Sequence, residues 1–446
     1  MRYLFLIGLL SFSTLFVKAQ DNPGGQTHEF NLQQCLDYAY ANQDSMKNAR
    51  LDIESANYKV KETIGIGLPQ VSGSAALQDY LKIPTTLLPG EFFNQPGTFI
   101  PVKFGVKYQA NAGLSVSQLL FNGTYLVGLK ASKTYKELSQ RAFNRTKIET
   151  EIAVTKAYYQ VLVNGEQLKL IDANLNQLKK QLNETTALNE QGFVEKIDLS
   201  RIQVLYNNLS TTRENTVRLL ALGYQLLKFQ MGMPVADNLK LTDKIEDIKL
   251  ETDLSVEPDT TAYRKRIEYG LLETQKKLNQ LDLQRIKSEA LPSLAAFGSG
   301  SYNFQSDQFS NLLDEKFPTV VVGLQLNVPI FSGFQRLNQV RQAKIAVQKS
   351  ENMLNTVKNG LQLQQEQARV MYTNGIQSLN NQKSNMSLAE EVLRVSRIKY
   401  EQGVGSSLEV TQAQTALEEA QNNYIQALYD ALISKVDLDR AYGRIQ

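Results

Sequence analysis

The chain has 446 residues, with 48 Lys and Arg against 45 Asp and Glu, which gives a formal net charge of +3. That near balance argues against a nucleic-acid partner, since such proteins carry a large basic excess. A single Cys excludes an intramolecular disulfide framework, and a single His argues against His-rich zinc sites and a His-based triad. Gly-rich phosphate-binding loops are also missing from the sequence. We therefore expect a protein that is not an enzyme and that binds no cofactor and no catalytic metal.

Residues 1–19 have the pattern of a cleaved signal peptide. Arg2 precedes an apolar run that extends to Val17, and Ala19 supplies a small residue at the expected cleavage site. A retained membrane anchor is the alternative, but hydroxyl residues interrupt the run and it is short for a spanning helix. We expect an exported protein whose mature chain begins with a tail at 20–30.

The remainder contains two copies of one pattern. The segment GLSVSQLLFNG at 113–123 recurs as GLQLNVPIFSG at 323–333, and QGFVEKIDLSRIQ at 191–203 recurs as QGVGSSLEVTQAQ at 402–414. Several landmarks in the same order indicate an internal duplication. The expected organisation is a first structural repeat over 31–232, an inter-repeat equatorial linker over 233–261 and a second structural repeat over 262–446.

Each repeat contains two stretches with the period of two that is typical of a strand with one buried face. In the clearer stretch of each pair, these apolar residues alternate with polar or small ones: Val106, Tyr108, Leu114 and Val116, and then Val320, Val322, Leu324 and Leu326. The partner strands begin after Leu-Pro at 68–69 and at 291–292. We predict strands at about 70–82 and 104–120 in the first repeat, and at about 293–304 and 319–330 in the second.

Long helices follow the strands. Proline is absent between Gly123 and Gly192 and between Gly333 and Gly403, and apolar residues there recur in steps of three and four. We predict helices over about 124–188 and 334–400, each on the order of 100 Å long at about 1.5 Å per residue. Tip turns at 189–196 and 401–406 then lead into returning helices at about 197–231 and 407–441. Further helices are predicted at about 36–66 and 262–290.

Four strands per chain cannot close a barrel, because the smallest closed membrane barrels have about eight. The strands therefore form either a soluble sheet or one barrel that several chains share. Two chains would supply eight strands with almost no lumen, whereas three would supply twelve strands around an open lumen. In lipid an open strand edge is not viable, so assembly of several chains would be obligatory there.

This organisation resembles the TolC-type outer-membrane efflux protein family, also called outer membrane factors. The resemblance is carried by the duplicated halves, the Leu-Pro strand openings, the phrases LLFNG and VPIFSG, and the tip phrase YEQGVGSSLEV at 400–410. It implies a mainly α fold with a membrane β part, in which long coiled-coil hairpins form a periplasmic tunnel. It further implies a homotrimer that shares a twelve-stranded barrel in the outer membrane of a Gram-negative cell.

The resemblance also implies a function and partners. The chain would be a passive exit duct in a tripartite efflux or type I secretion system, docked to a periplasmic adaptor protein and to an inner-membrane transporter of the RND or ABC type. The alternative is a periplasmic coiled-coil structural or adaptor protein without a membrane barrel. An adaptor normally needs one helical hairpin, and this sequence predicts two.

Three groups of residues are candidates for function. The resemblance places the adaptor contact at the tips, here Gly192, Phe193, Val194, Gly403, Val404 and Gly405; simple closure of the turns is the alternative for the glycines. The alternating strands offer as lipid-facing candidates Val106, Tyr108, Leu114, Val116, Val320, Val322, Leu324 and Leu326.

The third group is a candidate periplasmic gate. Asp198 and Glu409 both lie six residues after a tip glycine, where the resemblance implies a constriction lined by carboxylates that would favour cations. Tyr400 matches a family position that links to the acid of the other turn, here Asp198. Glu409 has a second interpretation, because Ser406 and Glu409 have the spacing of a helix capping box. Gly405 and Gln412 replace a basic and an acidic family residue, which predicts a weaker or differently built lock.

Overall fold

The computed structural model describes residues 27–245, 248, 250 and 261–445, so the expected signal peptide lies outside the described residues. The chain forms two compact units, each built from three segments. The hairpin unit comprises Met1–Gln43, Thr150–Glu251 and Gly375–Ile433. The sheet unit comprises Asp44–Glu149, Thr252–Asn374 and Ser434–Gln446. None of the helices in the described part of the chain combines the length and the apolar composition that a membrane-spanning helix requires.

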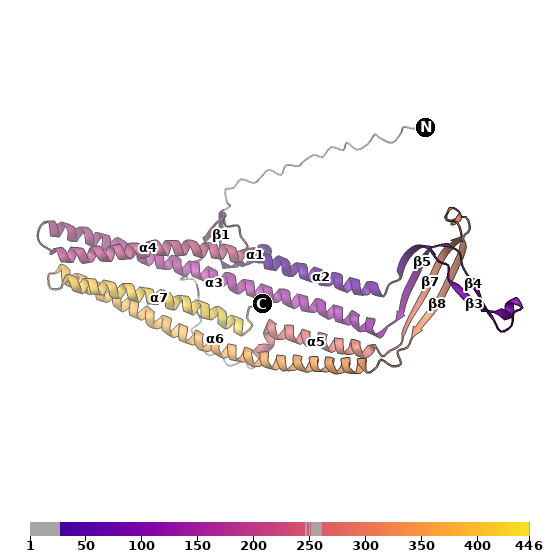
Figure 1. Cartoon of the computed structure of the whole chain (residues 1–446). Coiled ribbons are helices and arrows are strands. Elements are labelled where there is room, and N and C mark those ends of the chain that lie inside the picture. Colours follow the sequence, from indigo (N-terminus) through magenta and orange to yellow (C-terminus); the bar gives the residue numbers. More distant parts are fainter. Residues whose placement is uncertain (1–26, 246–247, 249, 251–260, 446) are drawn as a thin grey trace, which may run out of the picture. The chain divides into compact units, whose positions relative to one another are not determined.

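The chain contains two antiparallel helical hairpins (Figure 1), and the tip-side parts of both belong to the hairpin unit. The long helix α3 (Gly123–Glu190) returns as α4 (Lys196–Met231), and α6 (Gln335–Glu401) returns as α7 (Ser407–Ala441). Each hairpin is closed by its own apolar cluster. The first cluster is centred on Ile171, Leu178 and Leu209, and the second on Leu393, Val410, Ala413 and Leu417. The two long helices and the two tip turns predicted from the sequence are present.

A further core fixes the N-terminal helix α1 (Leu32–Asn42) against the first hairpin. Cys35 is fully buried there among Val154, Leu227 and Met231, and a free Cys in such surroundings behaves as a small apolar side chain. The short strand β1 (Thr27–Phe30) pairs in parallel with β6 (Asn238–Leu241), and neither strand was predicted.

The single helix predicted over 36–66 is wrong, because the structure divides it into α1 and α2 (Asp44–Ile66). Gln43 between them has an extended backbone, with ψ of 129°. The backbone of this junction lies against Gly232, where a Cβ atom would come within 2.7 Å of the Gln43 Cα. Asp44 places a carboxylate in the first turn of α2, where the helix dipole favours it.

Four glycines end four helices in the same way and make the duplication visible in the backbone. Gly192, Gly232, Gly403 and Gly443 all have positive φ, at 82°, 68°, 74° and 64°. At the first tip, Gly192 N–H donates to Asn189 and Phe193 N–H donates to Leu188. At the second tip, Gly403 and Val404 make the equivalent bonds to Tyr400 and Lys399. This pair of hydrogen bonds is the Schellman motif, for which a left-handed glycine is the favoured residue.

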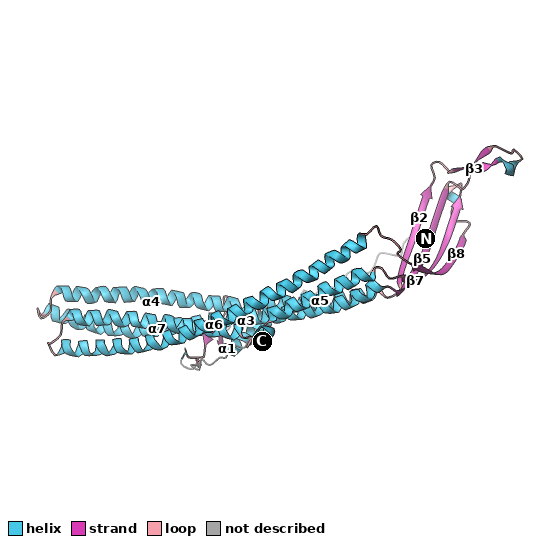
Figure 2. Ribbon diagram, turned by 90° about the horizontal axis from the view of Figure 1, so that it is seen from below, coloured by secondary structure: helices cyan, strands magenta, loops and turns pink. Residues whose placement is uncertain are grey.

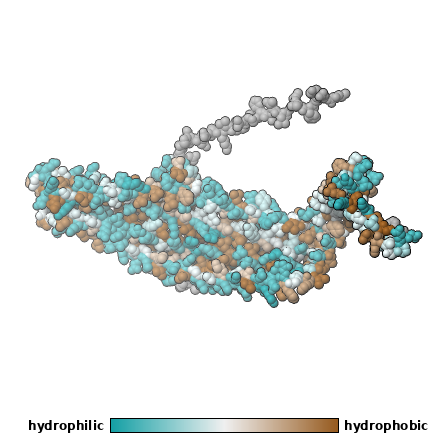
Figure 3. Space-filling view, viewed as in Figure 1, coloured by the Kyte–Doolittle hydropathy of each residue, from teal (hydrophilic) through white to brown (hydrophobic). Residues whose placement is uncertain are grey.

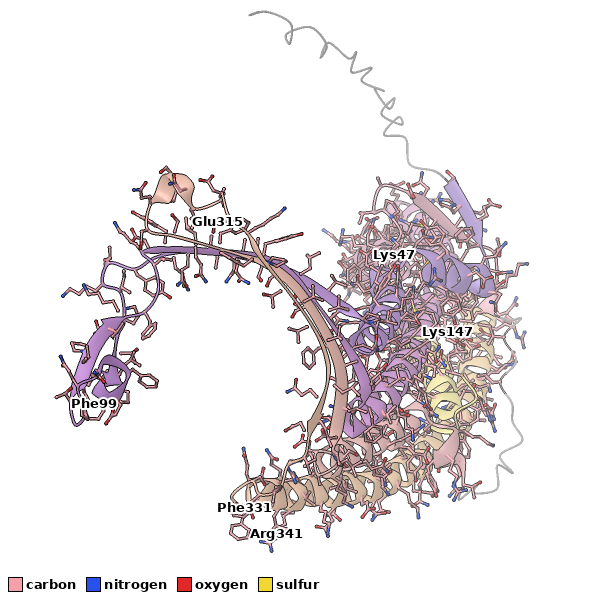
Figure 4. All side chains as sticks on the ribbon, turned by 90° about the vertical axis from the view of Figure 1, so that its right-hand side faces the viewer. Lys47, Phe99, Lys147, Glu315, Phe331 and Arg341 are labelled. Atoms are coloured by element: carbon pink, nitrogen blue, oxygen red, sulfur yellow. The ribbon has the colours of Figure 1, made fainter. Side chains whose placement is uncertain are left out.

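The sheet unit carries a four-stranded antiparallel sheet in the order β2-β5-β7-β8 (Figure 2). Its strands are β2 (Gln70–Asp79), β5 (Tyr108–Phe121), β7 (Ser293–Ser306) and β8 (Phe317–Asn327). As predicted, β2 and β7 begin directly after Leu-Pro. Strand β8 ends before Pro329, whose nitrogen has no hydrogen to donate to a ladder. Figure 4 shows the sheet bent into an arc. Helices α2 and α5 (Ile267–Ser288) precede β2 and β7.

The segment at 83–103 contains structure that the sequence analysis did not predict. Strands β3 (Thr85–Pro89) and β4 (Phe99–Lys103) form a separate hairpin around the short 3-10 helix η1 (Gly90–Phe93). Its four prolines conceal the alternation that identifies a strand, although an isolated hairpin tolerates them at its edges. Two other short 3-10 helices are η3 (Ala262–Lys265) before α5 and η4 (Phe309–Asn311) between β7 and β8.

Gly232 and Gly192 give a matched test of what the helix-ending glycines contribute. Both need positive φ, but a Cβ atom at Gly192 meets open space whereas one at Gly232 meets the backbone of Asn42 and Gln43. We expect Gly192→Ala to lower the free energy of unfolding by about 1–2 kcal/mol, the cost of left-handed backbone. Gly232→Ala should cost a further 1–3 kcal/mol, roughly, from overpacking. Thermal unfolding followed by circular dichroism measures both, and equal losses would contradict the proposed contact.

Candidate functional site

The register of the main sheet brings the predicted apolar positions onto one face. Leu114 pairs with Gly300, which pairs with Val320; Val116 pairs with Gly298, which pairs with Val322. Directly paired residues of an antiparallel sheet project from the same face. The same parity adds Tyr108, Leu324 and Leu326 to this face, whereas Val106 lies before β5 begins. We call this surface the apolar face.

The apolar face is exposed. Val320 and Val322 keep 80% and 81% of their accessible surface, and Leu114 keeps 64%. Figure 3 shows hydrophobic side chains gathered over the strands. Contiguous exposed apolar surface of this kind marks a contact with a membrane or with another protein.

The opposite face of the same strands is polar, and we call it the polar face. Ser72 pairs with Ser115, and their hydroxyl oxygens lie 2.7 Å apart. Asn303 of β7 donates its amide to the hydroxyl of Thr319 of β8, at 3.2 Å. One sheet therefore separates an apolar surface from a hydrogen-bonding surface.

Both outer edges of this sheet are open in the described residues. Strand β2 pairs with β5 alone, and β8 pairs with β7 alone. Their outward backbone groups therefore have no strand partner within the described chain. Such edges readily accept another strand, which makes them sites of assembly.

The tip turns present apolar side chains to solvent. Phe193 is 76% exposed and Val404 is 74% exposed. Val194, which was expected to be exposed with them, is half-buried, and its carbonyl oxygen accepts from the Asn189 amide at 2.7 Å. The sequence reasoning missed Ile197 and Leu408, which are also exposed and occupy equivalent places in the two repeats. The offset of the tip phrases was the signal that would have found this pair.

The two candidate gate carboxylates each have a cationic partner. Asp198 accepts from Arg201 at 3.1 Å within α4, and Glu409 accepts from Lys399 across the turn at 3.4 Å. Sequence reasoning named neither cation. The carboxylates are therefore partly neutralised, which weakens the electrostatic argument for a purely anionic ring.

Of the two hydrogen bonds of a capping box at Ser406 and Glu409, the structure shows the one to the Ser406 hydroxyl. The Glu409 backbone N–H donates to the Ser406 hydroxyl at 3.2 Å, while the Glu409 carboxylate faces Lys399. In the described residues no hydrogen bond joins Tyr400 to Asp198. Tyr400 instead packs against the apolar cluster of the second hairpin and lines a cavity of about 200 Å³ between α3 and the α6–α7 pair.

Buried polar side chains form hydrogen bonds within the second hairpin and between the two hairpins. Arg397 donates to Gln414 at 3.0 Å, and Gln414, only 1% exposed, donates to Glu418 at 3.1 Å. Farther along, the Asn174 amide donates to the Gln421 carbonyl oxygen at 2.5 Å in a buried site. The hairpins also meet through a buried apolar cluster, in which Val163 of α3 packs with Ile425, Leu428 and Leu432 of α7. Burial raises the pKa of the Glu418 carboxyl, opposed by the hydrogen bond from Gln414.

In the parts of the chain that the structure describes, no group of three or more His, Cys, Asp or Glu side chains is arranged to hold a metal ion.

Comparison with known proteins now decides the family. The sequence model of the family described as "Outer membrane efflux protein" matches residues 35–219 and 271–444. The chain belongs to this family. The two matched segments correspond to the two structural repeats, so the duplication and the resemblance to TolC-type proteins are both confirmed.

Individual members of the outer membrane efflux protein family are distant from this chain in sequence. The outer membrane protein TolC of Vibrio cholerae is 20% identical over 75% of this chain and 77% of that protein. The alkaline protease secretion protein AprF of Pseudomonas aeruginosa is 24% identical over 72% of this chain and 66% of that protein. The crystal structure of the open state of the Neisseria gonorrhoeae MtrE outer membrane channel matches with a TM-score of 0.75 at 16% identity. That match covers 93% of this chain and 89% of MtrE, and it shows a shared fold.

Glu418 gives this efflux-family chain a testable pH dependence. Because burial raises the pKa of its carboxyl above the ordinary value of 4.5, the folded state binds the proton more tightly than the unfolded state. This contribution to stability is greatest when the carboxyl is protonated, and it falls as the pH rises from about 4.5 through the higher folded pKa.

Replacing Glu418 with Gln should reduce the loss of stability that occurs as the pH rises, and it should raise the unfolding temperature at neutral pH. Glu419→Gln is the matched control, because it removes the same charge from an exposed neighbour. Unfolding temperatures measured at several pH values from 4 to 8, roughly the range in which stability is usually highest, make the comparison. Parallel curves for the Glu418→Gln variant and the unaltered protein would contradict the assignment.

Proposed function

We propose that this chain is the outer-membrane channel-tunnel of a tripartite efflux or type I secretion system. The observation that carries the proposal is the main sheet, which has an exposed apolar face, a polar face and two open edges. In lipid, open edges are eliminated only by closure, and four strands are too few to close. Other copies of the chain must therefore complete the barrel.

Three copies satisfy these constraints best. Joining β8 of one copy to β2 of the next gives twelve strands, with the apolar faces toward lipid and the polar faces around a lumen. Two copies would give eight strands, and side chains fill a barrel of that size. The homotrimer also agrees with the curvature of the sheet, which is bent into an arc (Figure 4).

The helical hairpins would form the periplasmic tunnel. Helices α3 and α6 contain 68 and 67 residues, which at about 1.5 Å each gives a length on the order of 100 Å. The tips would meet a periplasmic adaptor protein, and we assign that contact to Gly192, Phe193, Val194, Gly403, Val404 and Gly405, together with Ile197 and Leu408. An inner-membrane transporter of the RND or ABC type would supply the energy, and the chain itself would be a passive duct without enzymatic activity.

Asp198, Tyr400 and Glu409 remain our candidates for the periplasmic gate. Arg201 and Lys399 belong to the same constellation, since each neutralises one of the carboxylates. The closed state would then depend on charge pairs and on the packing of Tyr400 rather than on a bond from Tyr400 to Asp198. Export through a signal peptide cleaved after Ala19 completes the proposal.

The alternative is a periplasmic coiled-coil structural or adaptor protein without a membrane barrel. The exposure of Leu114, Val320 and Val322 on one face argues against it, because a soluble sheet would bury such a face. Family membership and the polar opposite face favour the duct. Whether the transported class is small molecules or proteins depends on the partner transporter.

Arginine substitution on the two faces tests the membrane assignment. Leu114→Arg should cost about 2–4 kcal/mol if the side chain lies near the bilayer midplane. Ser115→Arg, which places the same charge one residue later on the polar face, should be much milder. The yield of trimer in outer-membrane fractions, measured on unheated gels, reports assembly. Equal defects, or a monodisperse monomer in mild detergent, would overturn the proposal.

A charge change at the second tip tests the gate. Glu409→Gln should lower the preference for cations, because it removes one negative charge per chain from the constriction. The helix cap should survive, since Ser406 accepts from the backbone of residue 409. Lys399→Gln is the opposing control and should raise cation preference by exposing the carboxylate of Glu409. Reversal potentials across planar bilayers measure both, and unchanged selectivity in correctly assembled variants would leave capping as the role of Glu409.

A further inference from the structure

The segment between β7 and β8 borders an open cavity on the apolar face. The cavity has a volume of about 470 Å³, within the range of ligand pockets in proteins. Its floor is formed by small and apolar side chains of three strands, namely Ala75, Leu77, Ala110, Ala112 and Phe304. Phe309 and Leu312 of the connecting segment form its cover.

The cover is held in place by specific contacts. The Phe309 ring meets the Tyr108 ring edge-on, with centroids 5.5 Å apart. The Asp307 carboxylate accepts from the Lys107 backbone N–H at 3.2 Å, which ties the segment to the start of β5. Leu312 is only 4% exposed, although it lies in a connection between strands. In Figure 4, the segment marked by Glu315 lies on the convex side of the sheet.

The floor explains why space remains under this cover. Ala75 pairs with Ala112 across β2 and β5, and Leu77 pairs with Ala110. Alanine methyl groups leave a recess between the larger Leu77 and Leu114 side chains on the same face. A cavity lined by apolar side chains stays dry or takes an apolar ligand. The recess therefore suits a hydrocarbon chain better than water.

Two ammonium groups lie beside the recess. Lys107 Nζ is 4.9 Å from the centroid of the Tyr108 ring, and Lys316 Nζ is 5.5 Å from the centroid of the Tyr302 ring. Tyr108 contacts the cover, and Tyr302 pairs with Ala112 of the floor. Lys107 also interacts with the Tyr108 hydroxyl and with the Asp79 carboxylate, so a phosphate group attached to the chain in the recess would share this ammonium group with them, whereas Lys316 would meet the phosphate more directly.

We propose that the β7–β8 segment and the recess of the apolar face bind an acyl chain of an anionic, phosphate-bearing membrane lipid, with Lys107 and Lys316 at its headgroup. This rests on the proposed function, which places the apolar face in lipid. The recess lies toward the end of the strands where β2 leaves and β5 and β8 enter the sheet, opposite the end joined to α2 and α5. It would therefore face the leaflet on the far side of the membrane from the helices.

The bilayer around the recess determines which interactions can make it prefer one lipid over another. A lipid tail gains little hydrophobic free energy by leaving the bilayer for an apolar recess, because both are equally apolar. Preference for one lipid must then come from packing against the recess and from the two ammonium groups. The site should accordingly distinguish lipids by charge more than by chain.

The sequence contains no Trp, so a single introduced Trp is a unique fluorescent reporter. The Phe309→Trp variant places it in the cover, and the Val322→Trp variant places it on the uncovered part of the same face. Both assembled proteins are reconstituted in vesicles of phosphatidylcholine and phosphatidylglycerol, with bromine on the chains of one lipid at a time. Bromine quenches Trp fluorescence at contact, so the pair of measurements gives the relative occupancy of the two lipids.

We expect phosphatidylglycerol to be preferred about 25-fold at Phe309→Trp, because two lysines at about 1 kcal/mol each act together, and to show little preference at Val322→Trp. Adding Lys107→Gln or Lys316→Gln to the Phe309→Trp variant should reduce the preference about fivefold each, equivalent to about 1 kcal/mol per lysine. Ala112→Phe should fill the recess and lower quenching by both lipids. Because that variant risks a failure to assemble, the two lysine variants provide an independent test.

Equal lipid preference at both reporters, unchanged by the lysine substitutions, would overturn the lipid site and leave the proposed function intact. Absence of quenching by either lipid at Val322→Trp would overturn the membrane placement itself. The two failures are therefore distinguishable in one set of vesicles.

Discussion

The arrangement of the chain depends on the main sheet, whose two edge strands lack partners and whose apolar face is exposed. Four strands expose one apolar face, of which the β7–β8 segment covers only a part, and they leave two open edges that no other strand of the described chain pairs with. An apolar face of this kind is costly in water, and an open edge is costly in lipid. Only an environment that supplies both hydrocarbon and further strands resolves the conflict. Copies of the same chain supply those strands most simply, because β8 and β2 lie at opposite edges of one sheet.

A second constraint acts between the helical hairpins. Each hairpin buries its own apolar cluster, and the hairpins meet through the Asn174–Gln421 hydrogen bond and through a shared apolar cluster of Val163 with Ile425, Leu428 and Leu432. Separating the helices within a hairpin, or one hairpin from the other, would therefore expose apolar area to water.

Elements governed by local periodicity were predictable from the sequence. The alternation at 106–116 and 320–328 identified two strands, and Pro69 and Pro292 located the starts of their partners. The β3–β4 hairpin was missed because Pro89 and Pro101 disrupt the alternation, and the break at Gln43 was missed because its cause is packing against the distant Gly232. Lys399 was missed for a related reason, because its pairing with Glu409 depends on the geometry of the turn, whereas the i, i+3 spacing of Asp198 and Arg201 was readable from the sequence. The recess depends on a loop fold that has no periodic signal.

The two tip turns share their backbone geometry but differ in their ion pairs. Backbone geometry is retained, since Gly192 and Gly403 end their helices with the same pair of hydrogen bonds. Charge pairing differs, because Asp198 pairs within its own helix whereas Glu409 pairs with Lys399 on the preceding helix. Exposed ion pairs contribute only about 0–1 kcal/mol, so this difference barely affects stability. It does alter where charge lies, since among the ion pairs of the described residues Lys399–Glu409 joins the two helices of the second tip across the turn, whereas Asp198–Arg201 stays within one helix. Three copies of the chain would therefore alternate two kinds of tip around the tunnel, and the charge at its end would follow from that alternation rather than from a uniform ring.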